Sequence, residues 1–191
     1  EEPSDNTVLV LVSDQPARLP ATIRSRCQRF RVNVPERTLA LDWLSDRVPD
    51  GSEADTCLQL AGGAPLTALA LAGAGILEAR RKRLDELVGI LDGRALALDV
   101  AQTWFKDEGL QGIYWLREWL MDMLRIRMTG QTRAVRSVDL AEVLAGLARR
   151  LDSRMMFSQL DAINRVLGAG AASLNRQLMT EDILLAWAAQ H

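Results

Sequence analysis

The chain has 191 residues, enough for one large domain or two small ones. Hydrophobic residues make up 48% and charged residues 25%, and the formal net charge of −2 gives no general signal for nucleic-acid binding. Two cysteines, Cys27 and Cys57, and one histidine, His191, argue against a disulfide framework, a metal cluster and histidine-based catalysis. They fit a reducing, cytoplasmic setting, and no apolar run reaches the roughly 18 residues of a membrane span.

The first 34 residues carry the pattern of strands from an α/β domain. An apolar, β-branched run from Thr7 to Ser13 predicts a buried strand that ends by Pro16, because proline cannot donate to a strand ladder. Alternating apolar and polar residues over 28–34 predict a second, short strand. An isolated strand cannot satisfy its own backbone groups. We therefore expect this stretch to be the end of a sheet, and the chain to be the C-terminal part of a longer protein.

Three arginines, Arg24, Arg26 and Arg29, lie between the two predicted strands. Open α/β sheets place functional loops beyond strand ends, and a planar, permanently charged guanidinium there suits a phosphate group. From the residues alone, Arg26 has a second interpretation, as a surface or salt-bridging side chain. The chain contains no glycine-rich phosphate loop of the G-x-x-x-x-G-K-[ST] type.

Helical patterns fill the rest of the chain. After Pro35, three short helices separated by breaks at 49–52 and at Gly62-Gly63 predict a small bundle. Longer amphipathic segments follow, over residues 76–91, 95–105, 110–128, 138–151, 153–167 and 175–189. Ser153 can cap the fifth of these segments. The sequence predicts a mainly α protein that begins with a remnant of an α/β domain.

The residues around Arg26 resemble a known family. Ser25-Arg26-Cys27, preceded by Leu19-Pro20 and Thr22-Ile23 after the predicted strand, is similar to the clamp-loader subunits of bacterial DNA polymerase III. The resemblance implies that Arg26 is an arginine finger that projects into the ATP site of a neighbouring subunit. Ser25 and Cys27 are its motif neighbours. We expect Ser25 to orient the turn, and Cys27, which has no histidine nearby, to be a small buried packing residue.

The order of segments is also similar to this family. The resemblance implies a remnant of an AAA+ α/β domain over residues 1–34, a three-helix lid over 35–75 and a helical collar, the oligomerisation domain, over 76–191. In the family, the collar packs with its counterparts from the other subunits into a ring. The segment from Asn175 to Leu185 looks like the final collar helix.

Position 66 distinguishes two kinds of subunit within the family. The segment from Gly63 to Leu69 resembles the lid helix on which ATPase subunits present an arginine to bound nucleotide, and Leu66 stands where that arginine would be. An apolar side chain cannot neutralise phosphate charge, so the resemblance implies a subunit that does not itself turn over ATP. Ser13 and Asp14 coincide with a γ-phosphate sensor of the ATPases, but we interpret them as a polar pair that ends the strand.

Two groups of residues stand out on the longer helices. The basic run Arg80–Arg83 faces Asp85 and Glu86 at helical spacings, and we interpret it as a solvated helix face rather than a DNA contact. Trp115 and Trp119, with the methionines of the same helix, are expected in the core and at the collar interface.

The resemblance implies a non-catalytic clamp-loader subunit of the DNA polymerase III holoenzyme. It would supply Arg26 in trans and help to load the sliding clamp onto primed DNA during replication. No cofactor is expected in this part of the chain, since ATP and magnesium belong to neighbouring subunits. The expected partners are the gamma/tau-type ATPase and delta subunits, with no membrane involved. Two alternatives stay open: an ATPase-type clamp-loader subunit, and a helical regulatory or ligand-binding protein.

Overall fold

The computed structural model describes residues 6–13, 15–48, 51–168 and 175–189. The chain divides into two compact units, Glu1–Val34 and Pro35–His191. Every regular element in the described residues is a helix, which confirms the prediction of a mainly α protein. The assignment of residues 1–34 to an AAA+ domain stays a prediction.

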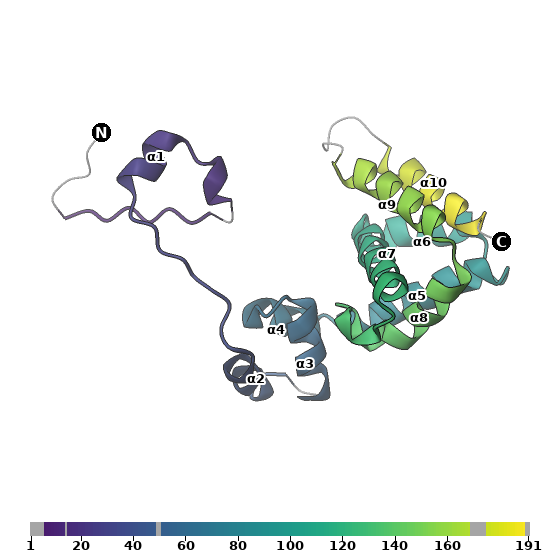
Figure 1. Cartoon of the computed structure of the whole chain (residues 1–191), viewed down its shortest axis with the longest axis horizontal. Helices are drawn as coiled ribbons and strands as arrows, with labels where there is room; N and C mark the ends of the chain where they lie inside the picture. The colour runs from purple at the N-terminus through teal and green to yellow at the C-terminus, as the bar shows by residue number, and fades with distance from the viewer. Residues whose placement is uncertain (1–5, 14, 49–50, 169–174, 190–191) are drawn as a thin grey trace. The chain divides into compact units, whose positions relative to one another are not determined.

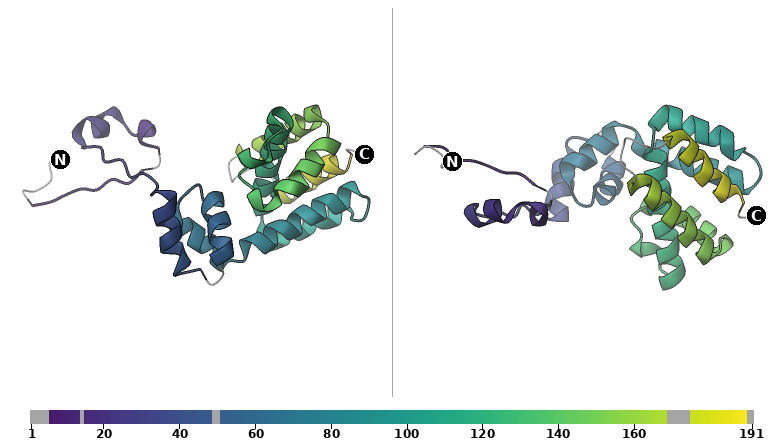
Figure 2. Two further views of the ribbon diagram at one scale, coloured as in Figure 1. Left: turned by 60° about the horizontal axis from the view of Figure 1, so that its bottom comes forward. Right: turned by 90° about the horizontal axis from the view of Figure 1, so that it is seen from above.

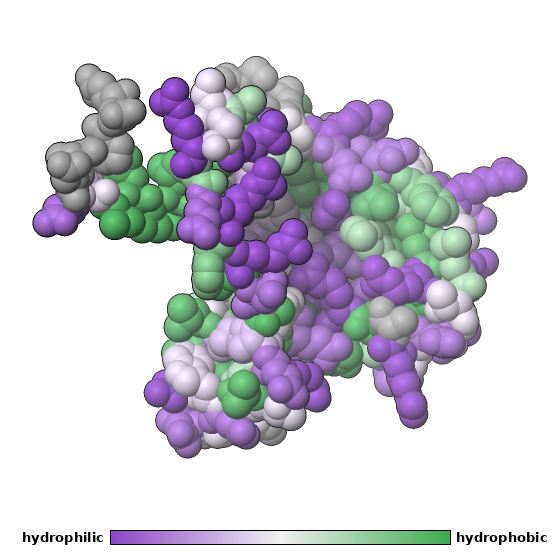
Figure 3. All heavy atoms as spheres, turned by 60° about the vertical axis from the view of Figure 1, so that its left-hand side comes forward, coloured by the Kyte–Doolittle hydropathy of each residue, from purple (hydrophilic) through white to green (hydrophobic). Residues whose placement is uncertain are grey.

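The first unit holds two short helices, η1 (Pro16–Arg18, a 3₁₀ helix) and α1 (Ala21–Arg26), joined to extended backbone. Residues 7–13 and 28–34 contain no β-strand, so both strand predictions are wrong for this chain. A strand needs a partner's N–H and C=O groups, and the described residues of this unit supply none. None of the unit's described side chains is buried, and apolar side chains of 8–12 lie on its surface (Figure 3).

The second unit begins with three short helices, α2 (Arg37–Ser45), α3 (Gly51–Leu60) and α4 (Pro65–Gly73), seen in Figure 1. Pro65 begins α4, where a missing N–H has no intrahelical partner to lose. The three helices enclose a small apolar core of their own around Leu44, Cys57 and Ala68. We call them the three-helix bundle.

The longer helices follow and share a larger core, which includes the fully buried Trp104, Trp119 and Trp187. Their bounds are α5 (Ile76–Leu91), α6 (Ala97–Glu108), α7 (Gln111–Thr129), η2 (Thr132–Ala134), η3 (Val138–Leu140), α8 (Ala141–Arg150), α9 (Ser153–Gly168) and α10 (Arg176–Ala188). Helix α7 packs against α8 and α9, and α10 packs against α6 and α9 (Figure 2). We call this assembly the large helical bundle.

Side chains cap two of the later helices. Asn175 Oδ1 accepts a hydrogen bond of 3.3 Å from the backbone N–H of Leu178 at the start of α10. At α9 the cap is Asp152, whose Oδ1 accepts from the backbone N–H of Arg154 at 2.8 Å, and the expectation of a Ser153 cap is wrong. Ser153 already lies in the first turn of α9. The carboxylate of Asp152, which precedes this turn, also interacts favourably with the positive end of the helix dipole.

The basic run on α5 is not a solvated face, which corrects the interpretation from sequence. Arg80 and Arg83 are each only 2% exposed, while Arg81 and Lys82 face solvent. The charge of Arg83 is balanced at 3.0 Å by both Glu86 and Asp107. Buried arginines need such partners because an unpaired buried charge is very costly.

The two tryptophans of α7 lie in the core, as expected. Trp115 and Trp119 are buried, and their ring centroids are 6.4 Å apart. The guanidinium of Arg80 lies 5.6 Å from the Trp119 ring, within the range of a cation–π contact. The methionines of α7 differ in exposure: Met123 is buried, whereas Met128 is largely exposed.

The carboxyl group of Asp139 faces the buried Arg80, and its protonation should make the stability of this buried cluster depend on pH. Burial raises the pKa of its carboxyl group, although Arg80 Nε lies 3.7 Å away and opposes the effect. A raised pKa in the folded state makes the carboxyl group less favourable to stability as the pH rises through that pKa. We therefore expect Asp139→Asn, which mimics the protonated acid, to gain stability relative to wild type between pH 4 and pH 7. Thermal unfolding at both pH values measures this, and a difference that does not change with pH would contradict it.

Candidate functional site

The Ser25-Arg26-Cys27 motif lies at the C-terminal end of α1. Arg26 is the last residue of this helix, and the backbone N–H of Cys27 closes it with a 3.1 Å hydrogen bond to the carbonyl of Ile23. The Ser25 hydroxyl donates to the carbonyl of Thr22 at 3.2 Å, within the same turn. The motif is therefore part of a short helical turn, not of the loop that the sequence indicates.

The positive charge around Arg26 is uncompensated locally. Five arginines and no acidic residue lie between residues 15 and 35. Arg26 is exposed, and it makes no hydrogen bond or ion pair with any described residue. A guanidinium presents five N–H donors in a planar fork that fits two phosphate oxygens. The side chain is thus chemically available for an anionic group supplied from elsewhere.

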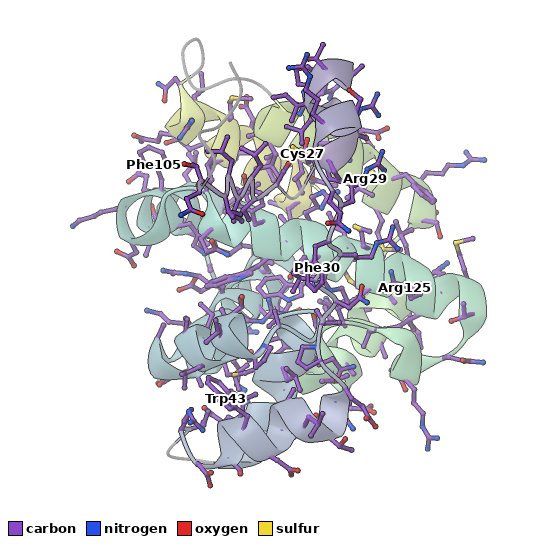
Figure 4. The ribbon with its side chains drawn as sticks, turned by 90° about the vertical axis from the view of Figure 1, so that its left-hand side faces the viewer. Cys27, Arg29, Phe30, Trp43, Phe105 and Arg125 are labelled. Carbon is purple, nitrogen blue, oxygen red and sulfur yellow. The ribbon has the colours of Figure 1, made fainter. Side chains whose placement is uncertain are left out.

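The neighbours of Arg26 differ from the sequence expectation in one respect. Cys27 is exposed, so the expectation of a buried packing residue is wrong for this chain. The reason is that α1 has only six residues and no described side chain of its unit is buried. Figure 4 labels Cys27 with Arg29 and Phe30 on the same segment. Ser13 Oγ accepts from the backbone N–H of Gln15 at 3.1 Å, whereas Asp14 lies outside the described residues.

Leu66 lines an apolar groove on the three-helix bundle. The groove has a volume of about 380 Å³ and is lined by Pro35, Leu39, Ala40, Trp43, Pro65 and Leu66. Leu66 itself is 73% exposed, and Trp43 extends from α2 (Figure 4). The guanidinium of Arg47 lies 4.3 Å from the centroid of the Trp43 ring. Because the lining is apolar, this groove offers no donor set for phosphate groups.

Neither a metal-binding cluster nor a membrane-spanning helix is present among the residues that the structure describes. Among those residues, no three acidic, cysteine or histidine side chains gather in a way that could hold a metal ion. Within the same residues, no helix combines the length and the apolar character that crossing a bilayer requires.

A polar cluster at the joint between the two helical bundles was not foreseen from the sequence. Asp122 is 1% exposed on α7, and its carboxylate accepts from the backbone N–H groups of Arg136 and Ser137 at 3.1 and 2.9 Å. The sequence contains one sign of this cluster, an aspartate among the apolar residues of the long amphipathic segment 110–128. These two partners lie beyond a loop, so spacing could not have identified them, whereas Arg125, which binds Asp122 Oδ1 at 2.7 Å, lies three positions along the same helix.

Two family models match the chain. The model for the C-terminal domain of the DNA polymerase III delta subunit covers residues 74–189, and a second model, for the DNA polymerase III delta subunit, covers residues 1–36. The chain belongs to the DNA polymerase III delta-subunit family. The first match begins where α4 gives way to α5 and includes all of the large helical bundle.

Curated relatives carry the name DNA polymerase III subunit delta'. The relative from Pseudomonas aeruginosa is 31% identical over 98% of this chain and 58% of its own length. The relative from Escherichia coli is 30% identical over 97% of this chain and 55% of its own length. The resemblance to DNA polymerase III clamp-loader subunits is thus confirmed, with delta' as the related subunit type. The chain spans a little over half the length of these two relatives.

Proposed function

We propose that this chain is the arginine-finger, lid and collar part of a delta'-type clamp-loader subunit. In this proposal it has no ATPase activity of its own and supplies Arg26 to the ATP site of a neighbouring subunit. The large helical bundle is the collar that joins it to gamma/tau-type ATPase and delta subunits. The assembled complex acts on the sliding clamp and primed DNA.

The observation that carries the proposal is the exposed guanidinium of Arg26, which has no ion pair among the described residues. It ends α1 within Ser25-Arg26-Cys27, the tripeptide of the finger in this family. Arg83, by contrast, is a structural arginine with carboxylate partners in Glu86 and Asp107. Among the exposed arginines, the surrounding tripeptide is what distinguishes Arg26. An arginine finger instead has to remain available until the neighbouring subunit presents its nucleotide.

The apolar groove at Leu66 supports the absence of a nucleotide site in this chain. A cation at position 66 would be needed to neutralise phosphate charge, and Leu66 has none. We predict that this chain does not bind ATP in the presence of magnesium. Calorimetric titration of the purified chain measures this directly, and saturable heat with a micromolar midpoint would contradict it.

An exposed apolar hollow on the large helical bundle supports a contact with neighbouring collars. It has a volume of about 320 Å³ and is lined by Met121, Leu124, Arg125, Met128, Thr129 and Phe157. Phe157 is 50% exposed and Met128 is 79% exposed. Large apolar side chains that gather on a surface are typical of protein interfaces.

Assembly tests the proposed function. We expect the full-length protein to co-elute with the ATPase and delta subunits in size-exclusion chromatography, and Phe157→Asp to lower the fraction that co-elutes without lowering the thermal midpoint of the free subunit. Leu185→Asp is the matched control, because Leu185 is also partly exposed, at 44%, but lies on α10 and does not line the hollow. A wild-type protein that fails to join these subunits would overturn the proposal.

A further inference from the structure

The three-helix bundle and the large helical bundle meet at a short covalent joint. Only Ala74 and Gly75 separate α4 from α5, and Gly75 has a φ of +62°, in the left-handed region that favours glycine. The first turn of α5 contributes to the smaller core, in which Leu77 is buried. This apolar contact holds the bundles together, but a joint of two residues does not by itself fix the angle between them.

A polar contact crosses the same joint at the end of α3. In the last turn of this helix the carbonyls of Cys57, Leu58 and Gln59 accept from backbone N–H groups of residues 61–63. The carbonyl of Leu60 accepts instead from Arg136 Nη2 at 3.3 Å, across 76 positions of sequence. The last carbonyls of a helix need such external donors, and a cation at this end also interacts favourably with the helix dipole.

The base of Arg136 is held by the large helical bundle. Its backbone N–H donates to Asp122 Oδ1, and the next N–H, from Ser137, donates to Asp122 Oδ2. The Ser137 side chain is fully buried and accepts from Arg80 Nη2 at 2.8 Å. The Arg136 guanidinium also lies 4.0 Å from Glu118. The buried, hydrogen-bonded side chains of Asp122 and Ser137 therefore fix the backbone from which the half-exposed Arg136 side chain reaches α3.

We propose that Arg136 is a positioning residue that latches the three-helix bundle at one angle to the large helical bundle. The latch joins a carbonyl of α3 to a loop held by buried Asp122 and Ser137.

Spin labels on the two bundles test the fixed angle in the full-length protein. A keto amino acid placed at Asp46 and at Arg165, both exposed, carries the labels without using the native cysteines. We expect pulsed electron resonance to give one narrow distance distribution for the wild type, and a broader or shifted one for Arg136→Ala. Arg136→Lys should also broaden it, since a single ammonium cannot replace the planar fork.

Arg133→Ala is the matched control, because Arg133 lies in η2, on the same connection between α7 and α8, is exposed, and makes no hydrogen bond or ion pair with a described residue. It should leave the distribution unchanged. A wild-type distribution for both Arg136 variants, with the circular dichroism of the folded protein, overturns the latch. A broadening by Arg133→Ala as large as that from Arg136→Ala also overturns it.

Discussion

Replacing Gly112 by alanine is expected to lower the stability of the large helical bundle by about 2–3 kcal/mol, the upper part of the range for overpacking a core. A Cβ atom at Gly112 would lie 2.8 Å from Trp104 Cδ2 and closer still to Cε3. The ring cannot move aside easily, because Trp104 is fully buried and its Nε1 donates to Glu86 Oε2 at 2.7 Å. The close approach of α7 to α6 therefore requires glycine here.

Gly146→Ala is the control for the helix propensity of alanine. Gly146 lies inside α8, and a Cβ atom there would meet no atom within 4 Å. This variant should gain up to about 1 kcal/mol, the usual difference between glycine and alanine in a helix. Urea unfolding followed by circular dichroism measures both variants. Equal midpoints for Gly112→Ala and Gly146→Ala would show that the Trp104 contact does not constrain the helices.

The amphipathic pattern of the longer helices was sufficient to place them. The predicted segment 76–91 coincides with α5, and 110–128 differs from α7 by one residue at each end. These helices have wide apolar stripes and clear breaks between them, so local pattern and tertiary packing agree. The start of α9 shows the limit, because Asp152 and Ser153 are both good N-terminal caps and only the backbone geometry decides between them.

The sequence was less informative where a residue's partner is distant. Arg80 and Arg83 look like a solvated face because the run also contains Arg81 and Lys82, and their burial depends on Ser137 and Asp107, which other elements supply. The first unit shows the opposite case. The segment 7–13 has strand propensity, but a strand forms only with a partner, and the described residues of this unit contain none.

The candidate site could be located from the tripeptide but not described from it. Ser25-Arg26-Cys27 identified the position, while the helical turn of α1 and the exposure of Cys27 came only from the structure. Leu66 was informative in the sequence and in the structure. The sequence shows an apolar residue in place of a cation at this position, and the structure shows that this residue lines an apolar groove.

Arg26→Ala is expected to slow ATP turnover at the adjoining site of an assembled clamp loader by roughly 10³-fold or more, the lower end of the effect of an arginine finger where one is used. The fold should not change, because Arg26 is exposed and has no ion pair among the described residues. The loss of stability should stay within about 0.5 kcal/mol, as for other surface substitutions. Arg26→Lys should not restore turnover, since an ammonium cannot bridge two phosphate oxygens as a guanidinium does.

The most direct measurement is therefore single-turnover ATP hydrolysis by a loader reconstituted from the full-length protein, its ATPase and delta subunits, the sliding clamp and primed DNA. Arg24→Ala and Arg29→Ala serve as matched controls, because both residues are exposed and equally charged in the same segment. The proposal predicts that Arg26→Ala slows hydrolysis at one site while both controls behave like wild type. Equal losses from all three variants, or no loss from Arg26→Ala in a fully assembled loader, would contradict the finger and leave Arg26 as a surface arginine.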